Sequence, residues 1–215
     1  MKLKPSSLKS LSFAVLLCTA AAAHADITVY TDQAAFLAAL SAPGVDTFDD
    51  LTTAQTGSPL ARTAGAYSYR ASAGPVSNFF PAGTAGGDVW LSPTVSNDTI
   101  TFDSFGAVTG FGGNFFGSNV NGLFDPGRTM VLTATDGTTT RTVNLSNTTL
   151  STFLGFISDN PLASVTLHSD GVPGVTYWST ANNVTLGLPV PEPETYAMLL
   201  AGLGLVGFML RRRPS

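Results

Sequence analysis

Carboxylate and aromatic side chains are the chemistry-bearing groups of this chain. Residues 26–188 contain twelve Asp and four Arg, with no Glu, Lys or Cys, so their net charge is −8. Asp46, Asp49 and Asp50 cluster ahead of a polar stretch, and Ca²⁺ binds carboxylate and loop carbonyl oxygens. The cluster therefore predicts a structural Ca²⁺ site. The alternative is that these aspartates form turns and keep the surface soluble.

Aromatic rings supply a second candidate site. Sugar rings can pack on an aromatic platform while nearby Asp and Asn side chains bind their hydroxyl groups. The candidates for such a platform are Tyr67, Tyr69, Trp90, Tyr177 and Trp178. Their presence predicts a polysaccharide-binding surface. The alternative is that these rings, like most of the phenylalanines, fill the core.

Residues for catalysis are few. His168 is the one histidine of residues 26–188, and no Gly-x-Ser-x-Gly segment supplies a nucleophile for a triad. Asp49 and Asp50 are adjacent, so on a strand they would point to opposite faces and make a poor acid–base pair. Zinc ligands, phosphate-binding loops and dinucleotide fingerprints are also missing. We therefore expect a non-enzymatic protein without a cofactor, apart from the predicted Ca²⁺; the alternative is a secreted glycan-active hydrolase.

The N-terminal segment 1–25 has the three parts of a secretory signal peptide. Three lysines precede an apolar run over 11–23, and Ala23 and Ala25 form a small-x-small cleavage site. We expect cleavage after Ala25, which would also remove Cys18, the only cysteine. An uncleaved N-terminal membrane helix is the alternative.

The C-terminal segment 189–215 combines three features. They are, in order, a proline-rich part (Pro191, Glu192 and Pro193), an uncharged apolar run (197–210) and a basic end (Arg211, Arg212 and Arg213). The apolar run would form a helix of about 21 Å, which snorkelling arginines bring close to spanning the ~30 Å hydrocarbon core. The arginines should stay cytoplasmic, so residues 26–188 would face the other side of the membrane.

The order of these three features resembles the PEP-CTERM sorting signal. The resemblance implies that an exosortase in the inner membrane of a Gram-negative, exopolysaccharide-producing bacterium recognises Pro-Glu-Pro and removes the tail. The exported protein would then pass from a membrane-anchored intermediate to the cell surface or the extracellular matrix. A plain C-terminal membrane anchor is the alternative. Segments 27–36, 98–102 and 153–158 are similar to parts of PEP-CTERM ectodomains of unassigned function, which implies an all-β ectodomain.

The pattern of residues 26–188 predicts one all-β domain. Short alternating apolar segments are separated by turn residues every eight to twelve positions, which is typical of an antiparallel β-sandwich of jelly-roll type. The negative charge disfavours nucleic acid as a partner, because nucleic-acid binding depends on clustered cations. The function expected from these features is exopolysaccharide binding at the surface or in the matrix, with a ligand-free structural matrix component as a further alternative.

Local signals give more detailed expectations. A short helix is predicted over 33–40, capped by Thr31 or Asp32 and ended by the Pro-Gly pair at 43–44. The polar stretch 51–64 is predicted to be a loop, and Asp-Gly at 136–137 to be the turn of a hairpin. Separate strands are predicted over segments that include 76–80, 108–116, 175–179 and 183–188, with the glycines of 108–116 indicating a bulge or a close backbone approach.

Overall fold

The structure is a computed structural model, and it describes most of the predicted domain. The described residues are 26–75, 77–83, 87–171, 174–190, 200, 202–204 and 207. The predicted signal peptide and most of the predicted tail therefore lie outside the described residues. Among the residues that are described, no helix is long and apolar enough to cross a membrane.

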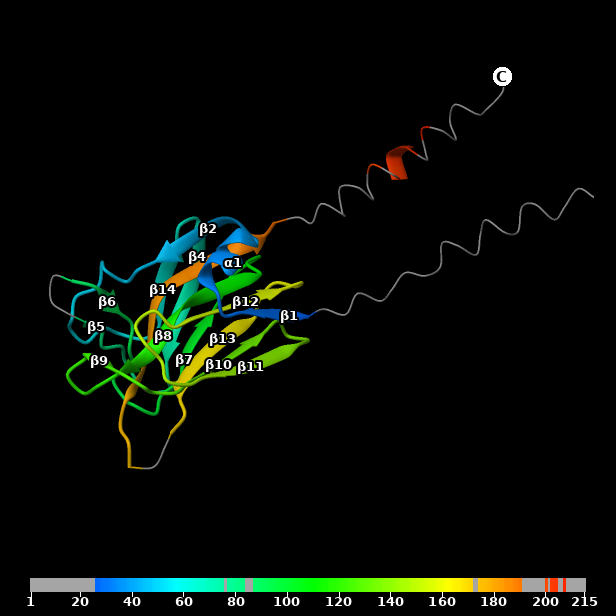
Figure 1. The fold of residues 1–215 in the computed structure, drawn as a ribbon. Coiled ribbons are helices and arrows are strands. Elements are labelled where there is room, and N and C mark those ends of the chain that lie inside the picture. The colour runs from blue at the N-terminus through cyan, green and yellow to red at the C-terminus, as the bar shows by residue number, and fades with distance from the viewer. Residues whose placement is uncertain are drawn as a thin grey trace, which may run out of the picture.

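Two six-stranded antiparallel sheets make up most of the domain (Figure 1). The first sheet has the order β1-β12-β8-β14-β2, with β9 paired to β8. Its strands are β1 (Ile27–Tyr30), β2 (Leu40–Asp46), β8 (Gly110–Ser118), β9 (Phe124–Asp125), β12 (Phe153–Ser158) and β14 (Trp178–Pro189). The long strand β14 is central, because it pairs with β8 on one side and β2 on the other.

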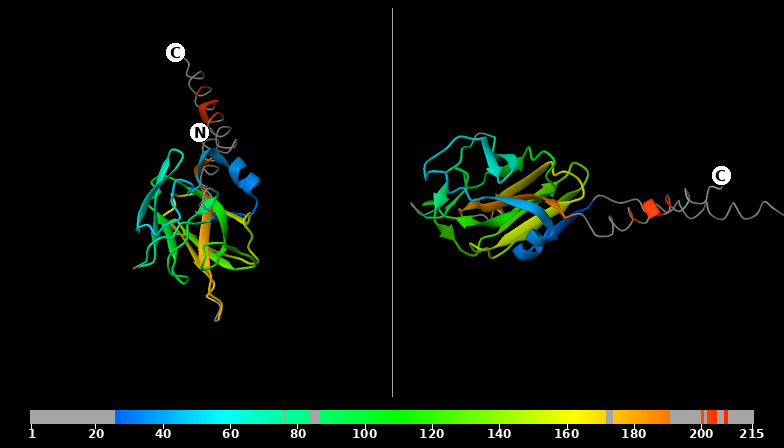
Figure 2. Two further views of the ribbon diagram at one scale, coloured as in Figure 1. Left: turned by 90° about the vertical axis from the view of Figure 1, so that its left-hand side faces the viewer. Right: turned by 90° about the horizontal axis from the view of Figure 1, so that it is seen from above.

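The second sheet has the order β11-β10-β13-β7-β4-β3. Its strands are β3 (Leu60–Ala64), β4 (Tyr67–Ala73), β7 (Ile100–Asp103), β10 (Met130–Thr135), β11 (Thr140–Leu145) and β13 (Ser164–Ser169). Two short strands, β5 (Ala82–Gly83) and β6 (Val89–Trp90), pair with each other. The single named helix of the described residues is α1 (Gln33–Ala38), on the outer side of the strands (Figure 2). The domain is therefore all-β with antiparallel pairing, as the sequence predicts.

One apolar core lies between the two sheets. Strands β10 and β13 bury every second residue, so their threonines and serines alternate with apolar side chains that face inward. Phe102 of β7 and Phe111 of β8 belong to different sheets, and their ring centroids are 5.1 Å apart. Both rings are fully buried. The alternating pattern of the sequence thus produces two faces that pack on each other.

The hairpin predicted at Asp136 and Gly137 is confirmed. β10 and β11 pair in register from Thr135 opposite Thr140 onward, and Gly137 has a positive φ of 91°. The Asp136 carboxylate accepts the backbone N–H groups of Thr139 at 2.6 Å and Thr138 at 2.8 Å. These hydrogen bonds hold the pKa of that carboxyl well below its usual range. The aspartate is thus a turn former, which is one of the roles expected from the sequence.

The helix α1 is shorter than predicted. Asp32 caps it by accepting the backbone N–H of Ala35 at 2.7 Å, but the helix ends at Ala38 and Leu40 begins β2. The Pro-Gly pair at 43–44 therefore lies inside a strand and does not end the helix. Pairing of β2 with β14 across the chain overrides the local helical pattern.

Three further predictions about strands were wrong. The end of the predicted loop 51–64 forms β3, which pairs tightly with β4 through a turn at Gly65, where φ is 58°. The strands predicted at 175–179 and 183–188 are one strand, β14, because its register shift near Asn183 lets pairing continue across the break. Of the strand predicted at 76–80, the described part contributes only isolated bridges of Phe79 to Thr56 and Pro93.

A glycine surface on the first sheet receives the helix. Phe36 of α1 is fully buried against β8 and β12. A Cβ on Gly155 would lie 2.5 Å from a ring carbon of Phe36, and one on Gly112 would lie 2.9 Å from the Phe36 and Phe153 rings. The glycines of β8 were expected to mark a bulge or a close backbone approach, whereas Gly112 and Gly155 make room for aromatic side chains.

Substitution of Gly155 tests this packing. Gly155→Val should lower the free energy of unfolding by about 1–3 kcal/mol, because the added methyl groups overpack the Phe36 contact. Urea unfolding measured by circular dichroism would give the change. Gly57→Ala is the matched control, since a Cβ at Gly57 meets nothing within 4 Å. Equal stability of the two variants would contradict the role assigned to the glycine surface.

Candidate functional site

A cleft lies at the end of the first sheet where β8 ends and β14 begins. In the register of these strands, Trp178 is opposite Ser118. The cleft has a volume of about 180 Å³. Its lining residues are Phe80, Ala82, Ser92, Pro93, Thr94, Ser118, Asn119, Val120, Gly122 and Trp178. Segments from four parts of the chain therefore meet here, and we call this feature the Trp178 cleft.

Hydroxyl groups form the polar floor of the Trp178 cleft. Ser92, Ser118 and Thr180 are all almost fully buried. The Thr180 hydroxyl bonds to the Ser118 hydroxyl at 2.9 Å, and the Ser92 hydroxyl donates to the Ser179 carbonyl at 3.2 Å. A hydroxyl can both donate and accept, so Ser118, which accepts from Thr180, keeps its own proton for a further hydrogen bond. The residues that the structure shows lining the cleft are all uncharged.

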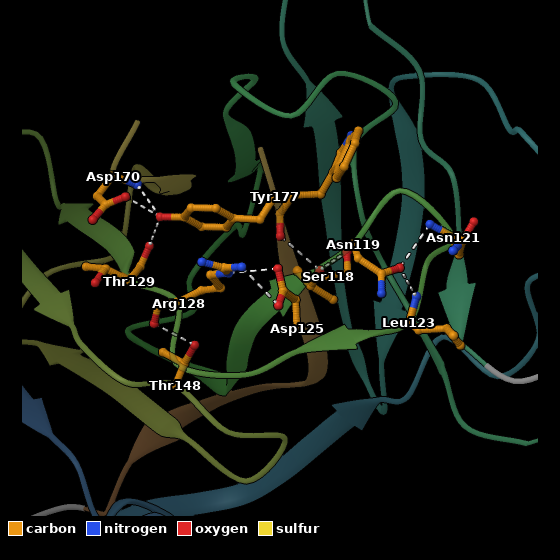
Figure 3. A network of polar contacts seen from close by, with 12 residues as sticks. Ser118, Asn119, Asn121, Leu123, Asp125, Arg128, Thr129, Thr148, Asp170 and Tyr177 are labelled. Atoms are coloured by element: carbon orange, nitrogen blue, oxygen red, sulfur yellow. Dashed lines mark hydrogen bonds and ion pairs between the residues drawn. The ribbon is translucent and has the colours of Figure 1, made fainter. Parts of the chain in front are cut away.

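The Asn119 side chain is held in one orientation at the cleft (Figure 3). Its carbonyl oxygen accepts the backbone N–H groups of Asn121 at 2.9 Å and Leu123 at 3.2 Å. These bonds fix the amide plane and so assign which end is oxygen and which is nitrogen. Within the described part of the chain, no hydrogen bond is made by the Asn119 NH₂ group. Two donors are therefore positioned beside the cleft.

Trp178 forms another wall. Its indole N–H donates to the Thr94 carbonyl at 3.3 Å, and the side chain is half-buried. The hydrogen bond restricts rotation of the ring, because the indole N–H has a single donor direction. Trp178 thus lines the cleft, whereas Trp90, the other tryptophan among the described residues, is buried.

A polar network around Tyr177, the residue before Trp178, anchors the start of β14 (Figure 3). The Tyr177 hydroxyl donates to the Thr129 carbonyl at 3.0 Å and is also hydrogen-bonded to Asp170. The Arg128 guanidinium lies 5.3 Å from the centre of the Tyr177 ring and pairs with Asp125 at 2.7 Å. Burial, together with the bond to Asp170, raises the pKa of Tyr177 to about 12. The network fixes the backbone that carries Trp178, so Tyr177 supports the cleft without lining it.

The other aromatic candidates do not share this surface. Tyr69 and Trp90 are only 3% and 6% exposed, so both are core residues. The Trp90 ring packs edge-on against Phe116 with centroids 5.3 Å apart. Tyr67 is half-buried and donates its hydroxyl to the Ala42 carbonyl at 3.2 Å, in a different part of the domain. Of the aromatic candidates, Trp178 is therefore the one that lines the Trp178 cleft, while Tyr67 lines a different cavity.

The predicted Ca²⁺ residues surround an arginine. Arg62 of β3 contacts both Asp46 and Asp50 at 2.6 Å. The Tyr69 hydroxyl also donates to Asp46, at 2.7 Å. Asp49 points elsewhere and accepts the Val89 backbone N–H at 3.1 Å. Sequence analysis missed Arg62 because β3 was predicted to be a loop, and only strand pairing places it beside the aspartates.

The charges of this cluster compensate each other. The hydrogen bond from Arg62 holds the pKa of Asp50 below its usual range, and the two aspartates raise the pKa of the guanidinium. No group of three His, Cys, Asp or Glu side chains that could hold a metal ion occurs among the described residues. The Ca²⁺ site stays a prediction, and the interaction that the structure shows for Asp46 and Asp50 is an ion pair.

The tail continues directly from the first sheet. The backbone N–H of Val190 donates to the Ala39 carbonyl at 2.9 Å, one residue after β14 ends at Pro189. Residues 189–213 match the PEP-CTERM protein-sorting motif. The PEP-CTERM motif thus begins at the last residue of a central strand. No curated protein and no solved structure matches the chain.

The match includes every sorting residue predicted from the sequence. These are Pro191, Glu192, Pro193, Arg211, Arg212 and Arg213. The side chains of all six lie outside the described residues, as do the predicted cleavage residues Ala23 and Ala25. The PEP-CTERM motif marks the chain as an exported protein that is sorted by an exosortase and anchored in the membrane before processing.

Removing Arg62 tests the ion-pair cluster. Arg62→Ala should lower the free energy of unfolding at neutral pH by about 3 kcal/mol, because Asp46, only 4% exposed, would keep a buried charge without its partner. The folded-state pKa of Asp50 is lowered by Arg62. The stabilisation of the fold by ionised Asp50 is therefore complete above about pH 4, and it is lost as pH falls further. The difference in the free energy of unfolding between Arg62→Ala and the wild type should therefore become smaller at acidic pH.

The control for this experiment is Arg141→Ala. Arg141 is exposed on the edge strand β11 and makes no ion pair among the described residues. Its removal should change stability by less than about 0.5 kcal/mol. Urea unfolding at several pH values measures both variants. A loss for Arg62→Ala no larger than for Arg141→Ala would show that the cluster contributes no stability.

Proposed function

We propose that this exported protein has no enzymatic activity and binds exopolysaccharide through the Trp178 cleft, at the cell surface or in the extracellular matrix. The domain that carries the cleft is, in this proposal, a jelly-roll-like β-sandwich. The single observation that carries the assignment is the PEP-CTERM motif on 189–213, which marks the chain as an exported protein. The two sheets with their shared aromatic core support the sandwich.

The position of the cleft relative to the tail supports this function. β14 begins at Trp178 and ends at Pro189, where the sorting motif starts. A strand of this length spans roughly 35 Å at ~3.3 Å per residue. The cleft and the tail are therefore at opposite ends of the first sheet (Figure 1). While the tail is held in the membrane, the cleft would lie at the end of the domain away from the anchored segment.

The chemistry of the cleft supports binding over hydrolysis. Glycoside hydrolysis requires two carboxyl groups beside the scissile bond, and the residues that line the cleft include no carboxylate and no histidine. His168, the one histidine of the described residues, is half-buried on β13 opposite Val131. A hydrolase of matrix glycans, which would show release of sugars from the polysaccharide, and a ligand-free structural component are the alternatives.

Processing of the tail can be tested in the producing bacterium. Intact mass should show loss of residues 1–25 in both strains, and loss of the apolar tail only when the exosortase gene is present. Glu192→Ala should block tail removal because it alters Pro-Glu-Pro, whereas the neighbouring variant Glu194→Ala should be processed normally. A tail that stays intact in the membrane of both strains would contradict exosortase sorting and indicate a plain membrane anchor.

Substitution of Trp178 tests the binding site. Trp178→Ala should weaken binding of the processed protein to the strain's own exopolysaccharide by about tenfold or more, which corresponds to 1.4 kcal/mol. Leu150→Ala is the control, because Leu150 is also exposed and apolar but lies outside the cleft. Co-sedimentation with the polysaccharide measures both variants, and circular dichroism confirms their folding. Failure of the wild-type protein to bind any exopolysaccharide would favour a ligand-free structural role.

A further inference from the structure

Three properties of the Trp178 cleft restrict what it can bind: its size, its polar groups and its lack of charge. The volume of about 180 Å³ is below the ~300–1,000 Å³ of pockets that enclose drug-sized ligands. A cleft of this size accommodates one ring of a ligand and leaves the neighbouring units of a chain outside.

The polar groups of the cleft suit a ligand rich in hydroxyl groups. The Asn119 NH₂ group offers two donors whose direction is fixed by the bonds to Asn121 and Leu123. The Ser92 hydroxyl already donates to the Ser179 carbonyl and can accept from a ligand, whereas the Ser118 hydroxyl accepts from Thr180 and keeps its own proton to donate. A sugar hydroxyl can likewise accept from the amide and donate to a serine, so both kinds of group find a partner.

Apolar walls complete the site. Trp178, Phe80 and Val120 all line the cleft, and Phe80 and Val120 are exposed, Val120 by 76%. An exposed valine and phenylalanine beside a half-buried tryptophan form an apolar surface that a ligand could cover. The C–H face of a sugar ring is the apolar part of an otherwise polar molecule, and it matches walls of this kind with a polar floor.

The absence of charge selects among sugars. A buried charge is costly unless it is paired, and the residues shown to line the cleft offer no cation for a uronate or a sulfated sugar. Three of the four domain arginines, Arg62, Arg70 and Arg128, are already paired with aspartates. The domain is also strongly negative overall, which repels an anionic polymer at longer range.

We infer that the Trp178 cleft recognises a single neutral sugar unit of the polysaccharide, by packing on Trp178 and by hydrogen bonds from Asn119 and the serine hydroxyls. The inference rests on the proposed function and makes it more specific. Binding to a polymer would then arise from repeated contacts with individual units, and would not require an extended groove.

The dependence of affinity on chain length tests this inference. The probes are the neutral exopolysaccharide fraction of the producing strain, its oligosaccharides of increasing length and its monosaccharides, titrated into the processed protein by calorimetry. The dissociation constant expressed per sugar unit should change by less than about threefold with length, well under the tenfold that 1.4 kcal/mol represents. A uronic acid of the same ring size should not compete.

Asn119→Asp is the matched variant. It keeps the carbonyl-type oxygen that accepts from Asn121 and Leu123 but removes the NH₂ donors and adds a charge. Affinity for the neutral sugar should fall by about tenfold, a change of 1.4 kcal/mol, while the thermal midpoint stays close to that of the wild type. Asn121→Asp is the control, because Asn121 contributes only its backbone N–H to this contact.

The outcomes separate the inference from the proposed function. A steep rise of affinity with chain length, with binding still lost in Trp178→Ala, would overturn the single-unit inference and leave polysaccharide binding in place. Tighter binding of the uronic acid than of neutral sugars would overturn the preference for a neutral unit. Absence of binding to both the polymer and its units would contradict the proposed function itself.

Discussion

The structure depends on the contact between the inward faces of its two sheets. Residues 26–190 contain no cysteine, so this domain cannot use a disulfide and must be stabilised by burial of apolar side chains. Phe102, Phe111 and Phe156 are fully buried in one continuous cluster, and the rings of Phe102 and Phe111 meet across the interface. Every polar site described above is held in place by strands whose other face contributes to this cluster.

Strand β14 connects the two features that matter for function. It lies between β8 and β2 in the first sheet, where both its edges are paired. Its last residues lead directly into the sorting motif, and its first residue, Trp178, forms a wall of the cleft. A strand that is paired along both edges is strongly constrained, so Trp178 and Pro189, the first residue of the sorting motif, are fixed relative to each other. The same strand therefore joins the cleft to the start of the motif.

The charged groups have mainly structural roles in this domain. Arg62 joins Asp46 and Asp50, and Arg128 joins Asp125 beneath the Tyr177 ring. Each arginine thus neutralises part of the negative charge of the aspartates next to it, at points where strands and loops meet. The remaining negative charge is distributed over the surface, while the cleft itself is uncharged. This separation leaves hydroxyl, amide and aromatic groups as the ones available to a ligand.

The sequence by itself determined the features that depend on neighbouring residues. These include the sorting motif, the alternating strands, the Asp32 cap and the turn at Asp136 and Gly137, because each arises from local backbone preferences or from a linear signal. Only the tertiary structure decided where β2, β3 and the full length of β14 run, since pairing between distant segments overrides local preference. It also decided that Tyr69 and Trp90 are buried and that Asp46 meets Arg62. The Trp178 cleft could not be predicted, because its walls come from four segments that meet only when the two sheets close on their common core.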